Sequence, residues 1–226
     1  DLIDAGYAGD PEGDRVDAGD AADGSDDDYI EAGLGNDTVL AGAGDDSVLG
    51  DLGDDSIDGG DGADTIRGGE GDDTVIGGAG DDVIYGNEDA DSLIGGAGDD
   101  TLEGGAGDDL LDGGIDDDVL TGGEGADTAL GGQGDDVITV AEGDRAEGGD
   151  GDDTFHVTDL GEAGAGTIEI VGGEGDETTG DTLNFHGLTH WDDVTLSDSD
   201  PGTGLSGNAI LTDGTVVNFS EVENII

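Results

Sequence analysis

The sequence has 226 residues, with 62 Asp and Glu against 3 Lys and Arg, a formal net charge of −59, 51 glycines and no cysteine. A chain this acidic and this poor in apolar residues is typical of disorder, so composition alone predicts an unfolded chain unless its carboxylates are arranged to hold cations. The charge excludes nucleic acid and anionic membrane surfaces as partners, no apolar run reaches the roughly 20 residues of a membrane span, and the lack of cysteine excludes disulfides and thiolate metal sites.

Residues 1–22 are predicted to form one or two irregular coils. The segments Asp1–Asp4 and Asp14–Asp17 both read Asp, any residue, an apolar residue, any residue, which is the second half of the repeat described below. They lack the glycine-rich half of that repeat, so no metal site is assigned to them. The chain begins within such a pattern, with neither Met nor a signal peptide, and we therefore expect it to be a fragment of a longer protein.

Thirteen consecutive nonapeptides, called units 1 to 13, run without a gap from Asp23 to Thr139. Unit 9 reads GGAGDDTLE (95–103) and unit 10 reads GGAGDDLLD (104–112). A further unit, GGDGDDTFH, follows at 148–156 after an interruption at 140–147. Position eight is apolar in every unit. Position six is aspartate in every unit, and these residues are the candidate metal ligands: Asp28, Asp37, Asp46, Asp55, Asp64, Asp73, Asp82, Asp91, Asp100, Asp109, Asp118, Asp127, Asp136 and Asp153.

Each unit combines a flexible half with a strand-forming half. Glycine in the first half allows positive φ, while positions seven to nine, such as Thr-Val-Ile in unit 6, favour a β-strand. Side chains alternate along a strand, so position eight points inward and position nine outward. If a six-residue turn reverses the chain, two units make one coil, and units two apart stack as parallel strands about 4.8 Å apart. The sequence predicts an all-β parallel solenoid.

Stacking brings the position-six carboxylates of neighbouring coils together. Two unit charges about 5 Å apart repel by about 0.8 kcal/mol in water and several times more near a protein surface, so the empty solenoid is not expected to form. A divalent cation between successive turns reverses the sign of this interaction. Carboxylates and loop carbonyls are hard oxygen ligands that suit Ca²⁺ better than Mg²⁺ or Zn²⁺. The sequence predicts about a dozen Ca²⁺ ions whose binding energy appears as folding energy.

The repeat GGxGxDxUx, in which U is apolar, resembles the calcium-binding nonapeptide of the RTX (repeats-in-toxin), or hemolysin-type, family. The resemblance covers residues 23–156. It implies a right-handed parallel β-roll with Ca²⁺ between its turns, and a secreted protein that leaves the cell unfolded by type I secretion and folds at extracellular Ca²⁺ concentrations. The expected division of the chain is 1–22 irregular coils, 23–156 calcium-binding β-roll and 157–226 C-terminal β cap.

Two features of the array leave alternatives open. Position five is aspartate in nine of the thirteen units, and its carboxylate either faces solvent or is a direct ligand. Glycine is replaced by Asp23 and Asp26 in unit 1, by Asn87 and Asp89 in unit 8, and by Asp116 in unit 11. These loops either bind the cation with a small distortion, because Asn and Asp tolerate positive φ best, or their side chains add a ligand.

Residues 157–226 change character and are predicted to cover the end of the solenoid, which otherwise exposes its core and edge strands. Short strands are expected at 167–171, 181–185, 194–196, 209–212 and 216–219, with a hairpin turn at Asp213-Gly214. Apolar bulk comes from Phe185, Trp191, Phe219, Ile225 and Ile226.

The ending FSEVENII is also similar to segments that precede Hint self-processing domains. Such a domain begins with a nucleophilic cysteine, which this chain lacks, so we do not expect that chemistry here.

No catalytic site is predicted. His186 and His190 are spaced i, i+4, but HGLTHW lacks the glutamate of a zinc protease and contains Gly187, a poor helix former. The Asp-Asp pairs recur along the whole array, whereas catalysis needs one distinct site. The sequence therefore predicts a calcium-binding structural module rather than an enzyme.

Position nine of the even-numbered units forms a modest apolar row on the predicted outer face: Leu40, Asp58, Ile76, Ile94, Asp112 and Leu130. Contiguous exposed apolar patches mark interaction sites. The row is therefore either a surface for self-association or adhesion, or a set of scattered surface residues. Position three carries no ladder of Thr or Asn, which argues against an ice-binding face at that position.

Overall fold

The computed structural model describes residues 2–4, 15–16, 27–158, 167–173, 180–184, 191–199, 205–211, 215–222 and 224–226. Every secondary-structure element in these ranges is a β-strand. None of the described segments is a helix long and apolar enough to cross a membrane.

Within the described ranges the strands form two long sheets. The sheet called the even sheet has twelve strands, in the order β1 (Leu2–Asp4), β4 (Thr38–Ala43), β6 (Ser56–Asp61), β8 (Thr74–Ala79), β10 (Ser92–Ala97), β12 (Leu110–Ile115), β14 (Thr128–Gln133), β16 (Arg145–Asp150), β18 (Thr167–Val171), β22 (Val216–Val222), β21 (Leu205–Leu211) and β20 (Trp191–Ser199). The sheet called the odd sheet has eleven, in the order β2 (Arg15–Val16), β3 (Tyr29–Leu34), β5 (Ser47–Leu52), β7 (Thr65–Glu70), β9 (Val83–Glu88), β11 (Thr101–Ala106), β13 (Val119–Glu124), β15 (Val137–Val140), β17 (Thr154–Val157), β19 (Thr182–Asn184) and β23 (Asn224–Ile225).

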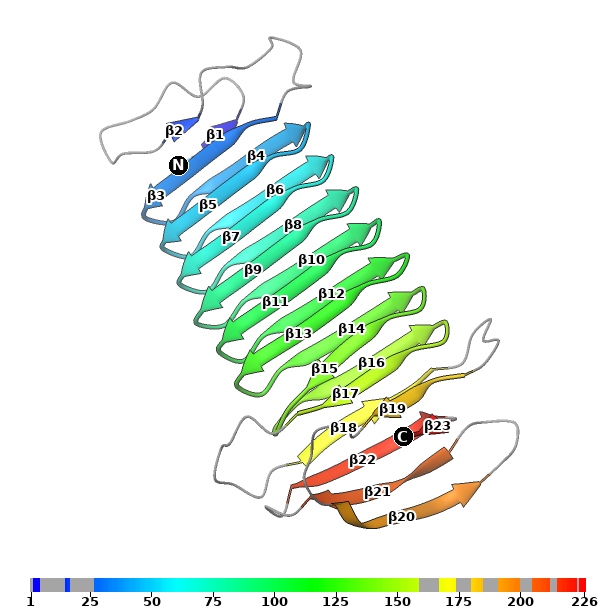
Figure 1. The fold of residues 1–226 in the computed structure, drawn as a ribbon. Coiled ribbons are helices and arrows are strands. Elements are labelled where there is room, and N and C mark those ends of the chain that lie inside the picture. Colours follow the sequence, from blue (N-terminus) through cyan, green and yellow to red (C-terminus); the bar gives the residue numbers. More distant parts are fainter. Residues whose placement is uncertain are drawn as a thin grey trace.

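Units two apart stack as parallel strands, as the repeat predicts. Leu93 in β10 lies between Val75 in β8 and Leu111 in β12. The same offset of eighteen residues joins all neighbouring strands from β3 to β15. Each coil contributes one strand to each sheet, and the result is the elongated β-solenoid of Figure 1.

Position eight forms the core between the two sheets. Val75, Ile84 and Leu93 are fully buried, and the inward side chains of successive coils belong to one continuous cluster. One such aliphatic side chain stabilises its unit by about 1.5–3 kcal/mol. Fixing the backbone of nine residues costs about 1–2 kcal/mol for each residue. The apolar core alone therefore does not hold the solenoid together.

The strands are longer than the sequence predicts. A three-residue strand and a six-residue turn were expected, but each regular strand spans six residues, from position seven to position three of the next unit, as in Ser92–Ala97. Positions two and three remain in register with the next coil, Gly96 beside Gly114 and Ala97 beside Ile115. Glycine has a low strand propensity, and the sequence therefore predicts that the strand ends at position nine. The strand continues through the glycines because backbone pairing of this kind needs no side chain.

The two N-terminal segments behave differently. β1 pairs parallel with β4 and places Ile3 beside Val39, at position eight, as expected. β2 pairs antiparallel with β3, with Val16 opposite Ile30, which differs from the parallel pairing of the repeat units. The four-residue pattern identifies an apolar position but carries no information on strand direction.

At the C-terminal end, β20, β21 and β22 form an antiparallel meander, and β22 joins β18 in parallel. These strands overlap the three predicted at 194–196, 209–212 and 216–219, while Asp213 and Gly214 lie outside the described residues. The odd sheet continues through β19 and β23. The solenoid therefore ends in a β cap, as predicted.

The described part of the cap adds apolar side chains to the core of the solenoid. Val217, Phe219 and Val222 are buried in the core cluster, whereas Ile226 is half exposed. Phe185 lies outside the described residues, and only the backbone of Trp191 is described.

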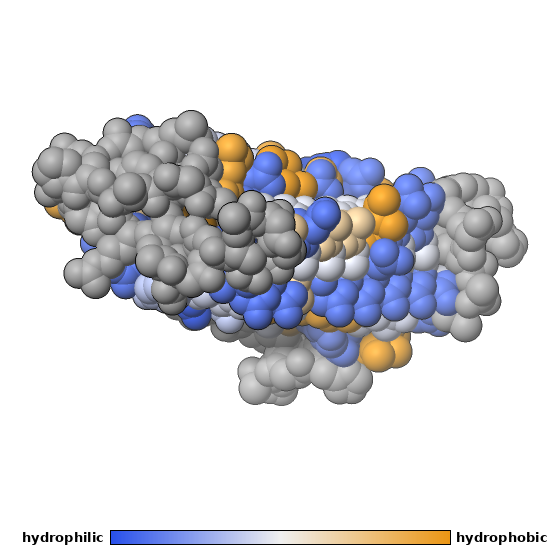
Figure 2. All heavy atoms as spheres, turned by 90° about the horizontal axis from the view of Figure 1, so that it is seen from above, coloured by the Kyte–Doolittle hydropathy of each residue, from blue (hydrophilic) through white to orange (hydrophobic). Residues whose placement is uncertain are grey.

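Position nine faces outward, as predicted. In the even sheet Leu40 is 45% and Ile76 is 37% exposed, and Asp58 stands between them in register. Figure 2 shows hydrophobic residues as separate patches among hydrophilic side chains on the face in view. The predicted apolar row is therefore present but interrupted.

Candidate metal centre

A row of buried carboxylates runs along each side of the solenoid, in the turn before each strand. The predicted position-six residues from Asp37 to Asp136, and Asp153, are at most 5% exposed. In Asp100, Oδ1 accepts a hydrogen bond of 2.8 Å from the backbone N–H of Asp82, one coil earlier. The same bond recurs along both rows at 2.7–3.0 Å. One carboxylate oxygen of each residue is thus used to join consecutive coils.

The second carboxylate oxygen is left without a partner in most of the array. Oδ2 is buried and accepts no hydrogen bond from the protein in Asp46, Asp55, Asp64, Asp73, Asp82, Asp91, Asp100, Asp109, Asp118, Asp127 and Asp136. A buried polar atom normally has a partner, and a buried charge without one carries a large free-energy cost. A repeating, uncompensated carboxylate oxygen indicates a missing cationic partner.

From Asp55 onward, each such Oδ2 lies beside the position-one glycine of its own unit. A Cβ atom added to Gly95 would overlap Asp100 Oδ2 and lie 2.7 Å from the carbonyl oxygen of Gly113, one coil further on. The same pair of oxygens borders the position-one glycines from Gly50 to Gly148, except Gly122, for which only the Asp127 carboxylate is this close. The glycine leaves open a small space that carboxylate and carbonyl oxygens border.

These oxygens fit a hard cation. No group of three or more His, Cys, Asp or Glu side chains converges on one point anywhere in the described part of the chain, so backbone carbonyls have to complete any coordination shell. Carboxylates combined with backbone carbonyls in flexible loops are the ligands that Ca²⁺ prefers in proteins, whereas Zn²⁺ takes His and Cys.

Comparison with protein families also indicates Ca²⁺. Six overlapping segments, 22–57, 49–84, 58–93, 85–120, 112–145 and 141–157, match the RTX calcium-binding nonapeptide repeat. Together they cover 22–157, more than half of the 226 residues. The chain belongs to the RTX repeat family. A comparison with curated proteins found no match. The RTX repeat is a calcium-binding structural repeat, and Ca²⁺ is therefore the cation of this array.

Burial raises the pKa of the RTX position-six carboxyls from Asp46 to Asp136. The pKa of Asp82 rises from 3.8 to about 6, and that of Asp118 to about 7. Loss of solvent is the largest cause; the backbone hydrogen bond to Oδ1 opposes it, and the nearest carboxylates of neighbouring coils add to it. Asp136 rises furthest, to about 8, with the charge of Asp153 contributing. In the absence of a cation the folded RTX array disfavours the charged carboxylates on which its calcium binding depends.

The odd row of carboxylates continues beyond the matched repeats, at a residue that the sequence did not assign as a ligand. Asp181 is fully buried, and its Oδ1 accepts a hydrogen bond of 2.8 Å from the N–H of Asp153, 28 residues earlier. A Cβ on Gly172 would overlap Asp181 Oδ2 and the carbonyl oxygen of Glu221. Glycine and aspartate thus meet here as in an RTX unit, although nine residues separate them in sequence. The Asp181-Thr-Leu signal in the sequence, with Leu183 inward, could have identified this position.

Asp144 ends the even row in a different way. It occupies position six of the interruption at 140–147, and its Oδ1 accepts the N–H of Asp127 at 3.0 Å. Its Oδ2 accepts the N–H of Ala141 at 2.6 Å. Backbone N–H groups therefore satisfy both oxygens of Asp144, so protein donors take the place of a cation in this coil.

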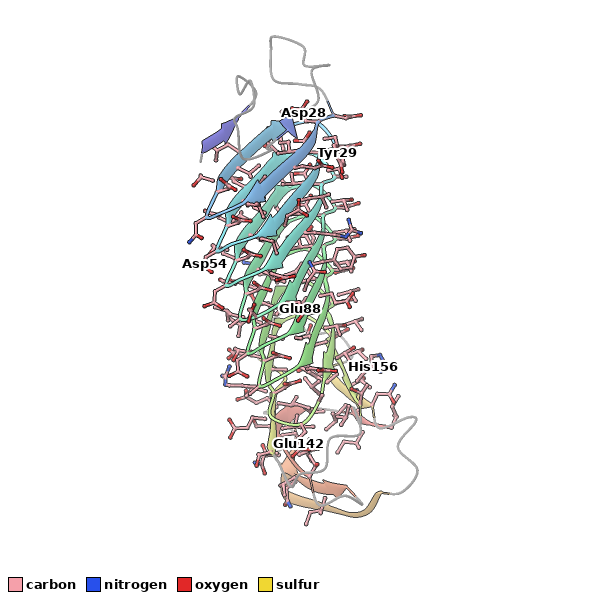
Figure 3. The ribbon with its side chains drawn as sticks, turned by 90° about the vertical axis from the view of Figure 1, so that its left-hand side faces the viewer. Asp28, Tyr29, Asp54, Glu88, Glu142 and His156 are labelled. Atoms are coloured by element: carbon pink, nitrogen blue, oxygen red, sulfur yellow. The ribbon has the colours of Figure 1, made fainter. Side chains whose placement is uncertain are left out.

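Position-five carboxylates form a second, exposed ladder. Asp81 Oδ1 accepts the N–H of Asp99 at 3.1 Å, and Asp99 Oδ1 accepts that of Asp117 at 3.2 Å. Asp54, which makes the same bond to Asp72, projects from the turn in Figure 3. Of the two alternatives for position five, the structure favours the solvent-facing one, with an added role in tying coils together.

The non-glycine residues at glycine positions keep the glycine backbone. Asn87, Asp89 and Asp116 have φ of 87°, 72° and 81°, and Asp51, which the sequence analysis did not single out, has 73°. Asp89 Oδ2 accepts the N–H of Gly71 at 3.2 Å. Asp23 and Asp26 lie outside the described residues. The loops thus keep the repeat conformation at a cost of about 1–3 kcal/mol for each strained residue.

Position one gives a direct test of the space beside Oδ2. Units 2 and 3 begin with the buried residues Ala32 and Ala41, while the later units begin with glycine. We expect Gly95→Ala to raise the Ca²⁺ concentration at the folding midpoint, because overfilling a packed site costs about 1–3 kcal/mol and this glycine has no positive φ that would add strain.

Circular dichroism during Ca²⁺ titration measures that midpoint. The reverse change, Ala41→Gly, is the matched control and should not raise it. Equal midpoints for Gly95→Ala and the unmodified chain would show that the space is not used.

Proposed function

We propose that this chain is the calcium-dependent folding module of a secreted protein, disordered where Ca²⁺ is scarce and folded at extracellular Ca²⁺ concentrations. The observation that carries the proposal is the set of buried position-six carboxylates from Asp46 to Asp136, each with one oxygen that accepts no hydrogen bond from the protein. The apolar core is too small to stabilise an empty solenoid, and the net charge of −59 destabilises it. Bound Ca²⁺ supplies the positive charge that would offset them.

The proposed ligands are a subset of the predicted aspartates together with Asp181. Each has the glycine space beside its Oδ2: Asp55, Asp64, Asp73, Asp82, Asp91, Asp100, Asp109, Asp118, Asp127, Asp136, Asp153 and Asp181. The carbonyl oxygen at position one of the following coil would complete each site together with further loop oxygens. Asp28 is partly exposed, and Asp37 and Asp46 belong to the units that begin with alanine, so they rank below the others. One ion at each of these carboxylates would give about a dozen Ca²⁺ ions, which is the number that the sequence predicts.

Secretion is part of the proposal on two grounds. RTX repeats are typical of secreted proteins, and an unfolded, highly charged chain at low internal Ca²⁺ suits export before folding. A type I route follows from the family resemblance alone.

A Ca²⁺ titration of the chelated chain tests the proposal. Far-ultraviolet circular dichroism should show a disordered chain in excess chelator and a cooperative gain of β signal up to millimolar Ca²⁺, with Mg²⁺ at the same concentration as the control. Strong β signal that persists in excess chelator would contradict it.

Self-association or adhesion is the second candidate function. It rests on the outward row from Leu40 to Leu130, which acidic residues interrupt at Asp58 and Asp112. We keep the calcium-dependent module as the proposed function, because the row offers no continuous apolar surface.

A further inference from the structure

One place on the odd sheet gathers several departures from the repeat. Arg67 is the only basic residue in units 1 to 13. Its guanidinium lies 4.8 Å from the ring centroid of Tyr85, one coil away. Position two, glycine in most units, is Asp51 and Asn87 in the strands on either side of β7, both at positive φ. Irregularities scattered in sequence thus become neighbours in space.

Arg67, Asp51 and Asn87 border a groove of about 310 Å³ across β5, β7 and β9. The groove is lined by Gly68 and Gly69, by Leu49 and Arg67 from position nine, by Asp51 and Asn87 from position two, and by Leu52, Glu70 and Glu88 from position three. The volume is at the small end of the roughly 300–1,000 Å³ range of ligand pockets. The groove therefore suits a small ligand.

The strained residues are not needed for the coil itself. A Cβ on Gly69 would meet the carbonyl oxygen of Asp51, and one on Gly105 would meet that of Asn87. In regular units a glycine carbonyl takes this place, as Gly78 does beneath Gly96. The backbone carbonyl therefore occupies the same place whether the residue is glycine, Asp51 or Asn87. The coil does not need the side chains of Asp51 and Asn87, because glycine would adopt this backbone without strain. Strain kept at such positions is a feature of functional sites.

The polar groups of the groove select the class of ligand. Arg67 offers only donors, the carboxylates of Asp51, Glu70 and Glu88 only acceptors, and Asn87 offers both. Among the described residues Arg67 has no ion pair, whereas Arg145 binds Glu147 at 2.9 Å. An anion is disfavoured by the three surrounding carboxylates, and the guanidinium among them offsets part of their attraction for a cation. Sugar hydroxyls both donate and accept without net charge, and Leu49 provides an apolar contact for a sugar ring.

We propose that the groove around Arg67 and Asn87 binds a neutral saccharide, one or two rings in size. Arg67 would donate to ring and hydroxyl oxygens, the carboxylates would accept from hydroxyls, and Tyr85 would hold the guanidinium in place by stacking. The site depends on the proposed function only because the groove exists when the array is folded. Binding is therefore measured on the full chain in saturating Ca²⁺, after circular dichroism has shown the β signal.

The probes are the methyl glycosides of glucose, galactose, mannose and N-acetylglucosamine, with acetate and spermidine as charged comparisons. At least one glycoside should shift the NMR amide signals of Gly68 and Gly69 saturably. Arg67→Ala should weaken its binding at least about tenfold, because hydrogen bonds to a charged group are lost. Arg145→Ala, on the other sheet, is the matched control and should leave the affinity unchanged.

Asn87→Gly separates binding from folding. It restores the repeat consensus, so the Ca²⁺ midpoint should stay the same or fall while glycoside binding weakens. The proposal is overturned if no glycoside shifts these amides, if only acetate or spermidine does so, or if Arg67→Ala binds as tightly as the unmodified chain. A chain that fails the circular dichroism check in Ca²⁺ would instead contradict the proposed function.

Discussion

Asp82→Asn combined with Asp100→Asn should lower the number of Ca²⁺ ions bound per chain and raise the Ca²⁺ midpoint of folding. The two residues are neighbours in one row, joined by the 2.8 Å bond from Asp82 N–H to Asp100 Oδ1. Asparagine keeps an oxygen that can accept this bond but removes the charge from the position of Oδ2. Each lost charged contact is worth about 1.5–3 kcal/mol, so we expect a loss of about 3–6 kcal/mol from the calcium-linked folding free energy.

The chain contains a closely matched control for this pair. Asp81 and Asp99 are the adjacent position-five residues of the same two units, are exposed, and are joined to each other by a similar backbone bond of 3.1 Å. Asp81→Asn with Asp99→Asn makes the same change in net charge. It should leave the stoichiometry unchanged and shift the midpoint little. Equilibrium dialysis with circular dichroism gives both quantities, and equal behaviour of the two double variants would remove position six as the principal ligand.

The regular part of the fold could be predicted because every unit repeats the same arrangement of apolar and acidic residues. An apolar residue at position eight, such as Leu93, has to face inward, and the aspartate two residues earlier, such as Asp91, is then placed in the turn. The pairing of units two apart follows from the coil length. Each of these expectations depends only on the number of residues between the aspartate, the apolar residue and the next unit, which can be counted in the sequence.

Other parts of the candidate site depend on contacts between distant segments. Asp181 lies at the end of the odd row although 28 residues separate it from Asp153, and its neighbouring glycine, Gly172, is nine residues away in sequence instead of the five of a regular unit. Asp144 has the right position in its unit, but the N–H of Ala141 already binds its second oxygen. Neither relation has a fixed spacing, so sequence periodicity could not reveal that Asp181 continues the row or that backbone donors satisfy both oxygens of Asp144.

Acidification should fold the chain in the absence of Ca²⁺. In excess chelator at pH 8 we expect a disordered chain, and at pH 4 to 5 we expect β signal to appear. Protonation removes the charge that makes the empty solenoid unfavourable, and a neutral carboxyl can occupy the buried site without a cation.

The sign of this effect follows from the direction of the pKa shifts. Burial raises the pKa of Asp82 from 3.8 to about 6 and that of Asp91 to about 7. The folded chain therefore binds more protons than the unfolded chain between these values. The stability of the empty solenoid is greatest below pH 3.8 and is lost as the pH rises through about 6 to 7. A rise from 3.8 to about 6 corresponds to about 3 kcal/mol for each carboxyl, and the shift recurs along both rows.

Protons and Ca²⁺ compete for the same oxygens, so the two ways of folding the chain should be linked. The Ca²⁺ midpoint of folding should fall as the pH is lowered from 8 to 6, because protons stabilise the same folded state, while fewer Ca²⁺ ions are bound per chain and the β signal in chelator increases over the same interval. Circular dichroism at low protein concentration measures the midpoint and the β signal, and analytical ultracentrifugation distinguishes a folded monomer from a precipitate near the isoelectric point of about 4.1. A chelated chain that remains disordered as a monomer at pH 4 to 5 would show that repulsion between buried carboxylates is not what keeps the empty solenoid from forming.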